Sequence, residues 1–218
     1  MNGFDWSIIV RNWQYLGQGM LLSLMLVVVA SAGGIALGFG LALMRLSRSR
    51  VLAGFATSYV TVMRSVPLIL VLFWFYFLVP LVIGHPISAL GSALVAFVLF
   101  EAAFYCEIVR AGILSVRRGQ TEAALATGMQ PSQALWLVVI PQAIRAMVPL
   151  VINQIVIVFQ DTSLVYVVAL TDFMTAASVV AQRDNRPIEV YTFVAVVYLV
   201  ICFVLSRSVA FYKARGSK

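Results

Sequence analysis

The sequence is poor in charge. Only 11% of its 218 residues are Asp, Glu, Lys or Arg, whereas 62% are apolar. A water-soluble domain of this size carries about 25% charged residues and about 45–50% apolar ones, so the composition excludes an ordinary soluble globule. One helix needs about 20 apolar residues to cross a hydrocarbon core ~30 Å thick. We therefore predict an all-α integral membrane protein whose residues 1–218 form a single transmembrane domain with room for about five crossings.

Cysteine, histidine and lysine are also scarce. The two cysteines, Cys106 and Cys202, lie in apolar stretches, which argues against a disulfide framework. The single histidine, His85, and so few cysteines leave none of the usual zinc-binding spacings. Lys213 and Lys218 are the only lysines, and neither follows a glycine-rich turn, so the chain has no phosphate-binding P-loop. We predict no metal site and no cofactor bound by this chain.

Apolar stretches divide the chain into five predicted spans. Residues 20–44 carry no charge and are long enough to cross with some tilt. Residues 66–100 are also uncharged but too long for one helix, and Pro80 and Gly84 break them. The predicted spans cover residues of about 20–44, 55–80, 88–112, 146–170 and 190–210. Polar loops are expected at about 115–145 and at 171–189.

Basic residues are divided unevenly between the two faces that these spans define. Twelve of the 15 lie on one face, and Arg11, Arg183 and Arg186 lie on the other. Because loops rich in Lys and Arg stay in the cytoplasm, we predict an N-terminus outside and a cytoplasmic C-terminus. This topology accounts for the net charge of +7, so the charge does not indicate a nucleic-acid partner. Membrane lipid is the expected surrounding of the chain.

Glycines and ionisable residues within the spans mark places where helices meet a neighbour. Gly34 and Gly38 are spaced for close helix packing, although glycine is in any case common in membrane helices. An ionisable side chain at bilayer depth costs about 2.5–3.5 kcal/mol or more, so it usually faces a cavity or a partner. Glu101 lies near the middle of the third span and Asp161 just past the middle of the fourth. Either could bind the ammonium of an amino acid, or the two could pair across a subunit interface in a subunit with no substrate site.

Other polar residues could line a transport path beside these acids. Arg64, next to a proline-marked helix break, could bind an anionic group, or its side chain could extend to the cytoplasmic interface. Neutral hydrogen bonds could come from Asn153, Gln154, Thr162 and Ser163. Glu107 and Arg110 are three residues apart on one helix face and are expected to pair. A membrane-embedded enzyme that uses Glu101, Glu107 and Asp161 is a remote alternative, because these acids are spread over two helices.

The segment at about 115–145 is not apolar enough to cross a membrane, but its sequence contains signals for the start and the end of short helices. A short helix containing Glu122, Ala123 and Ala124 should end at Gly128, the usual residue after a helix C-terminus. Pro131 can begin the next helix. Small residues on this helix would let another protein approach its backbone closely. The alternative is an amphipathic helix that lies on the lipid surface.

This segment resembles the cytoplasmic signature of ABC importer permeases. That signature reads Glu-Ala-Ala, three residues, Gly, nine residues and Ile-x-Leu-Pro; here it is Glu122-Ala123-Ala124, Gly128 and Val138-Val139-Ile140-Pro141. The resemblance implies the fold of a type I importer permease, with residues 122–128 as the coupling helix that docks on an ATPase. It also implies that Pro141 belongs to the same coupling region.

Further motifs are similar to the polar amino acid permeases over residues of about 15–210. They are Arg64-Ser65-Val66-Pro67-Leu68, residues 107–113 (Glu-Ile-Val-Arg-Ala-Gly-Ile), Pro141-Gln142-Ala143 and Asp161-Thr162-Ser163-Leu164. Residues 100–103 and 159–166 are most similar to glutamate/aspartate importers, although Gln160 stands where the family more often has lysine. Glutamine or a basic amino acid remains an alternative substrate.

The resemblance also implies a set of partners and a location in the bacterial inner membrane. ATP and Mg²⁺ would act at a cytoplasmic ATPase dimer, because this chain has no P-loop. A periplasmic binding protein would deliver the amino acid. A second permease subunit would complete the pathway, either a related chain in a heterodimer or a second copy.

Overall fold

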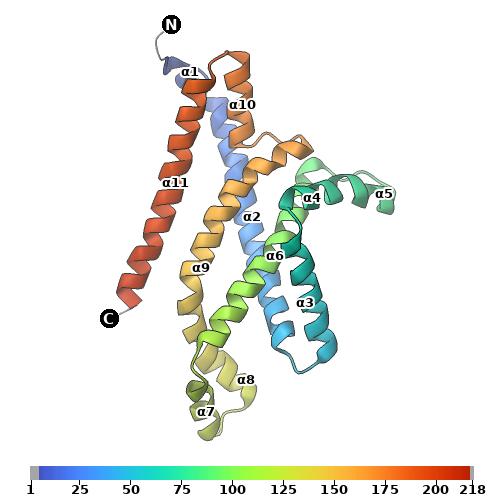
Figure 1. The fold of residues 1–218 in the computed structure, drawn as a ribbon, viewed down its shortest axis with the longest axis vertical. Coiled ribbons are helices and arrows are strands. Elements are labelled where there is room, and N and C mark those ends of the chain that lie inside the picture. Colours follow the sequence, from blue (N-terminus) through green and yellow to red (C-terminus); the bar gives the residue numbers. More distant parts are fainter. Residues whose placement is uncertain (1–4, 217–218) are drawn as a thin grey trace.

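The computed structural model describes residues 5–216, with side chains up to residue 209, and every regular element in this range is a helix. The long elements run side by side along one axis (Figure 1): α2 (Trp13–Leu46), α6 (Ala89–Ser115), α9 (Ile140–Asp161) and α11 (Pro187–Gly216). Among the described residues, four helices are long and apolar enough to cross a membrane. A fifth crossing results if the bent pair α3 (Arg50–Ser65) and residues 68–83 counts as one span.

The contact between α2 and α6 is extensive and depends on glycine. A Cβ atom on Gly38 would lie 2.8 Å from the backbone oxygen of Ala102 and 2.8 Å from the backbone nitrogen of Cys106. A Cβ on Gly34 would lie 2.9 Å from the ring of Tyr105, whereas one on Gly40 would meet open space. Small residues that let two backbones approach are a common device of membrane helix packing. The close-packing interpretation of Gly34 and Gly38 is therefore confirmed.

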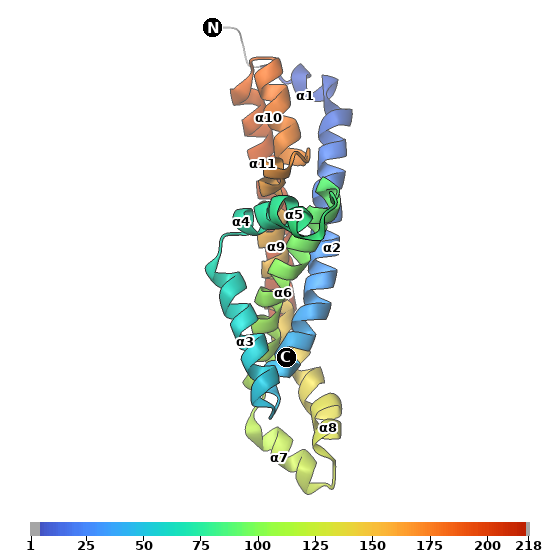
Figure 2. The ribbon, with the colours of Figure 1, turned by 90° about the vertical axis from the view of Figure 1, so that its right-hand side faces the viewer.

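The predicted second span at 55–80 is not one straight helix, which corrects that expectation. After α3 the chain bends by 105° and continues as α4 (Leu68–Phe73), η1 (Trp74–Leu78) and α5 (Val79–Ile83). Pro67 causes the break, because proline disfavours helical geometry in the preceding residue, and Val66 is extended at φ −114° and ψ 136°. Elements α4 and α5 consequently run across the long axis of the bundle (Figures 1 and 2).

Two stretches of π-helix share one cause. The first is η1, and the second is η2 (Leu135–Val139); each ends two residues before a proline, Pro80 or Pro141. A proline ring within a helix clashes with the carbonyl four residues earlier, and these carbonyls, at positions 76 and 137, both lie within the π-helical stretch. The wider π turn accommodates the ring.

The fourth apolar helix begins earlier than expected. Helical structure starts at α8 (Pro131–Ala134), continues through η2 and α9, and forms one apolar unit over residues 131–168. Residues 131–145 were assigned to the polar segment at about 115–145, in which Pro131 was expected to begin a helix; the structure joins that helix to the fourth span. The aromatic and aliphatic residues of η2 make them apolar enough to extend the span.

The predicted loop at 171–189 is also wrong, because it contains the helix α10 (Phe173–Arg183). Asp172 is the N-cap of α10, and its carboxylate accepts hydrogen bonds from the backbone of Met174 (3.0 Å) and Thr175 (3.1 Å). Buried Ala176 and Ala177 let α10 pack against α2 and α11. The polar residues taken as a loop signal are thus a cap and an exposed helix end.

Candidate functional site

The short helix predicted from the Glu-Ala-Ala sequence is α7 (Arg118–Ala126), at one end of the bundle (Figures 1 and 2). Gly128 follows it with φ +88° and donates a backbone hydrogen bond of 3.0 Å to the carbonyl of Leu125. Met129 donates one of 3.3 Å to the carbonyl of Ala124. These two bonds form a Schellman motif. The motif favours glycine at position 128 because the residue there has a left-handed backbone conformation. The predicted end of the helix at Gly128 and the predicted start of the next helix at Pro131 are both confirmed.

The two alanines of the Glu-Ala-Ala signature differ in exposure. Ala123 and Glu122 are exposed, whereas Ala124 is 6% exposed and lies against the body of the subunit. Gln120 accepts a hydrogen bond of 3.3 Å from Gln142, which ties α7 to the start of α9 next to the exposed Pro141. The outward face of α7 is therefore small and accessible, while its inward face fixes it to the subunit.

Three arginines from three helices meet at one glutamate. Glu107 accepts hydrogen bonds of 2.6 Å from Arg45 of α2 and 3.0 Å from Arg110 of α6. Arg64 of α3 approaches the oxygen already bound by Arg45, at 3.3 Å, and its guanidinium also lies 5.7 Å from the centre of the Phe104 ring. The Glu107–Arg110 pair predicted from the sequence is confirmed.

This ion cluster contains participants that the sequence did not reveal. The sequence predicts Arg45 only as one of the basic residues of the cytoplasmic face, and Arg64 either as a contact for an anionic group or as a side chain that extends to the cytoplasmic interface. No spacing in the sequence connects positions 45, 64 and 107, because they lie on three helices. Arg64 is the most accessible of the three arginines, with 46% of its side chain exposed against 15% for Arg45. It retains N–H donors for a further anionic group.

Glu101 lies in the interior of the subunit. It is fully buried between α2 and α9, and its Oε2 accepts a hydrogen bond of 2.9 Å from Gln154. Its Oε1 has no hydrogen-bond partner among the described residues. Two of the predicted path residues, Glu101 and Gln154, thus form a buried pair. Asn153, the neighbour of Gln154, is exposed on another side of α9.

Asp161 is the last residue of α9, where the helix changes to the 3₁₀ helix η3 (Thr162–Val168). Its side chain is partly exposed, lies within electrostatic reach of Glu101, and forms no hydrogen bond or ion pair with the residues that the structure describes. Thr162 is buried and donates to the carbonyl of Phe159, and the partly exposed Ser163 donates to that of Gln160. Asp161 is therefore a carboxylate at a helix break with free acceptor oxygens.

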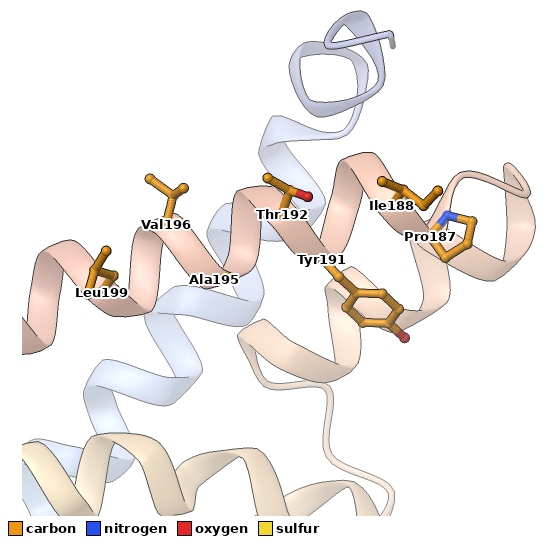
Figure 3. A pocket seen from close by; sticks show the side chains of 7 residues that line it. All are labelled: Pro187, Ile188, Tyr191, Thr192, Ala195, Val196 and Leu199. Atoms are coloured by element: carbon orange, nitrogen blue, oxygen red, sulfur yellow. The ribbon is translucent and has the colours of Figure 1, made fainter. Parts of the chain in front are cut away.

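A groove of about 560 Å³ follows the outer side of α11 (Figure 3). Its lining, between Pro187 and Leu199, contains no charged residue, and the hydroxyl of Tyr191 donates a hydrogen bond of 3.3 Å to Ser178 of α10. Such a surface cannot hold the charged groups of a free amino acid. It suits lipid or another membrane helix.

The end of the bundle opposite α7 has its own polar cluster. Arg183 donates a hydrogen bond of 2.6 Å to Asn12, which joins the end of α10 to the residue after α1 (Ser7–Arg11). The hydrogen bond from Arg183 lowers the pKa of Asp184 below its usual value. Arg11 completes the lining of a polar cavity of about 490 Å³. This cluster anchors the N-terminal segment to the bundle.

Among the residues that the structure describes, no group of three His, Cys, Asp or Glu side chains could hold a metal ion. The polar groups are distributed instead along a helical bundle with a short, largely exposed helix, α7, at one end. This arrangement defines a class of protein, the membrane translocation subunits.

Comparison with known proteins places the chain within that class. A family described as "Binding-protein-dependent transport system inner membrane component" matches residues 34–217. The chain is 47% identical over 225 residues to the glutamate/aspartate import permease protein GltK of Escherichia coli O157:H7, with 99% of each chain covered. It is 36% identical to the probable glutamine ABC transporter permease protein GlnM of Bacillus subtilis (strain 168), covering 97% of this chain and 98% of that one.

Solved structures share its fold. A crystal structure of an amino acid ABC transporter with histidines matches with a TM-score of 0.89 and 29% identity, covering 98% of this chain and 99% of the other. An inward-facing structure of the MetNI methionine ABC transporter matches with a TM-score of 0.77 and 19% identity, covering 94% and 97%.

The chain belongs to the family of binding-protein-dependent transport system inner membrane components. It is a permease subunit of an ABC importer, located in the inner membrane, and it is a transport subunit and not an enzyme. The family works with an ATPase, on which ATP and Mg²⁺ act, and with a binding protein.

Proposed function

We propose that this permease imports glutamate and aspartate. The observation that carries the proposal is 47% identity, over 99% of both chains, to a protein named as a glutamate/aspartate import permease. Import of glutamine or of a basic amino acid is the second candidate. Relatives named for glutamine and arginine transport are 36% and 30% identical, and the unpaired carboxylate of Asp161 would suit a cationic group.

The proposed topology has five crossings, with α3 and residues 68–83 together forming the second. The N-terminus lies outside and the C-terminus in the cytoplasm, because the basic residues of the α2–α3 connection and of α7 lie at the same end of the bundle. Lys213, Arg215 and Lys218, which belong to the same predicted face, have side chains outside the described residues. The whole chain is proposed to be one permease domain.

The proposed coupling site is α7 together with Gly128 and Pro141. Glu122 and Ala123 would contact one subunit of an ATPase dimer, and Ala124 would hold α7 against its own subunit so that ATP-driven movement reaches the bundle.

A second permease subunit, related in a heterodimer or identical in a homodimer, would close the pathway. The uncharged groove on α11 would face that subunit or lipid. A periplasmic binding protein would deliver substrate at the opposite end.

The proposed substrate contacts lie at two helix breaks. Asp161, where α9 becomes η3, would bind the ammonium group, with Thr162, Ser163 and Asn153 as neutral polar neighbours. Arg64, at the end of α3, would bind a carboxylate with the donors that Glu107 leaves free. Glu101 and Gln154 would support the path from the interior, because their buried pair holds α6 and α9 together.

The test of specificity is ATPase activity of the reconstituted importer. The complex of both permeases, the ATPase and the binding protein is placed in liposomes and titrated with glutamate, aspartate, glutamine, arginine and histidine. We expect stimulation by glutamate and aspartate alone. Stimulation by glutamine or by a basic amino acid instead would replace the proposed substrate while leaving the importer class unchanged.

A variant tests the role of Asp161. Asp161→Asn removes the charge but keeps the shape, and we expect the half-saturating substrate concentration for uptake to rise by about tenfold or more, as the loss of a charged hydrogen bond predicts. Asp184→Asn, the same change at an exposed position outside the spans, is the control. Equal uptake by both variants would show that Asp161 does not contact the substrate.

A further inference from the structure

A cavity between the described helices lies behind the proposed coupling helix α7 and is not part of the proposed transport pathway. It has a volume of about 790 Å³ and is enclosed by the ends of α2 and α6, by α7 and by the start of the α8–η2 segment. Figure 2 shows α7 and α8 at one end of the bundle, beyond the long helices. This volume is within the range of ~300–1,000 Å³ typical of small-molecule sites. It is too large to be a site for one or two buried waters.

The walls of the cavity are apolar. Eight of its twelve lining residues are aliphatic or proline, among them Leu43, Leu46, Leu114 and Leu135. Leu46 and Leu114 are 38% and 58% exposed, although each is within two residues of the end of a membrane-spanning helix. Apolar side chains exposed at the membrane boundary need an apolar neighbour. A free amino acid or a nucleotide would leave these walls uncovered.

The mouth of the cavity is basic. Arg118 lines it, and Arg48, Arg50 and Arg117 are exposed on the chain segments that enter and leave it. None of these four arginines forms an ion pair with the described residues, and Glu122 is the one acid on the lining. The charges of the lining itself, Arg118 and Glu122, balance, so the excess of three positive charges comes from the flanking Arg48, Arg50 and Arg117. An apolar body with an anionic head matches both the walls and the mouth.

The position of the cavity adds to the argument. The contacts that hold α7 come mainly from η2 and α8, together with the Gln120–Gln142 hydrogen bond. The ends of α2 and α6 face α7 across the cavity. Whatever fills this space determines how firmly α7 is held against the two most closely packed spans.

We propose that an anionic phospholipid occupies this cavity, with an acyl chain between Leu46, Leu114 and Leu135 and its phosphate at Arg118. Basic pockets between membrane helices on the cytoplasmic side are known to bind anionic lipid headgroups. The bound lipid fills the gap behind α7, so that a movement of the coupling helix is passed to α2 and α6. The proposal rests on the family and on the geometry, and it is independent of which amino acid is transported.

The test measures lipid retained by the purified importer complex. The complex is extracted in mild detergent, exchanged against phosphatidylglycerol, and the bound lipid is counted by native mass spectrometry. Arg118→Gln should weaken retention about fivefold, the loss expected for one arginine near an anionic headgroup. Leu135→Trp, which fills the cavity, should abolish retention of the same molecule. Arg145→Gln and Leu137→Trp change exposed residues of the same types that do not line the cavity, and retention should be unchanged.

A functional readout complements the lipid count. In nanodiscs, phosphatidylglycerol should raise substrate-stimulated ATPase activity of the unmodified complex above that in phosphatidylcholine, and Arg118→Gln should lose this increase. Equal lipid retention by all four variants would overturn the proposal. An equal loss of lipid in Arg118→Gln and Arg145→Gln would also overturn it, because it would indicate unspecific charge attraction. Crosslinking of a cysteine at Ser47 to the ATPase would overturn it as well, because protein would then fill the cavity.

Discussion

The α2–α6 interface and the coupling helix α7 use small residues for opposite purposes. In the interface, Gly34 and Gly38 are buried, and any added atom would meet the backbone or a ring of α6. In α7, Ala123 is exposed and is proposed to contact a partner outside the chain, although the adjacent Ala124 is buried within it. A small residue in a membrane protein can therefore serve packing inside the subunit or docking outside it. Only its surroundings distinguish the two uses.

The largest effect should come from the interface. Gly38→Val would place a side chain on the backbone of Ala102 and Cys106, which cannot move aside cheaply, and we expect a loss of more than about 3 kcal/mol of stability. Gly40→Val makes the same change two residues later in open space and serves as the control. The melting temperature and the monodisperse fraction of the purified importer measure both. A pair of variants with the same melting temperature would show that α2 and α6 are not closely packed.

The second effect concerns the buried pair in the same region. Glu101→Ala leaves the amide of Gln154 without its partner and opens a cavity, which should cost about 2–4 kcal/mol. Glu101→Gln keeps an acceptor oxygen for Gln154 and should cost much less. Thermal unfolding distinguishes these outcomes. If Glu101→Gln lost uptake but not stability, the ionised carboxylate would serve transport instead of packing.

The third prediction separates the two sides of α7. Ala123→Trp should leave the subunit folded but lower substrate-stimulated ATPase activity about tenfold or more, because the bulky ring would prevent close docking. Ala124→Trp should also lower the amount of assembled complex, since that position is inside the subunit. Activity is measured per assembled complex. Normal activity in Ala123→Trp would argue against the outward face as the ATPase contact.

The smallest effect lies at the end of α7. Gly128→Ala places a Cβ on a residue with φ +88°, which costs about 1–2 kcal/mol. Gly119→Ala, in open space within the helix, should instead stabilise α7 by about 1 kcal/mol. Amide hydrogen exchange over residues 118–128 should be faster in the first variant and slower in the second. The opposite order would exclude the Schellman motif as the stop signal of α7.

Much of the fold was predictable from local sequence. Hydrophobic length located the apolar helices, and the Gly128 and Pro131 signals located the end of α7 and the start of α8. The loop predicted at 171–189 failed because Asp172 was taken as a loop residue when it is a helix cap. The second span was predictable only in part, because Pro67 marks a break in the sequence but a break does not reveal the size of the bend, which is 105°.

The candidate site was predictable only in part. The signature residues of α7 and the pairing of Glu107 with Arg110 depend on spacing along one helix, which the sequence displays. The approach of Arg45 and Arg64 to Glu107 depends on how three helices cross. A membrane helix that is apolar on all sides has a weak periodic pattern, so its inward face cannot be identified from sequence.

The amino-acid sequence alone identifies this chain as a helical membrane protein with a Glu-Ala-Ala signature and without a P-loop. These properties follow from composition and from motifs confined to single segments. The tertiary structure decided which glycines are buried, which alanine faces outward, which arginines surround Glu107, and that a cavity with apolar walls and a basic mouth lies behind α7. Each of these features depends on contacts between segments that are far apart in the chain. The free energy of such a contact depends on both segments, so the residue type at a single position does not predict it.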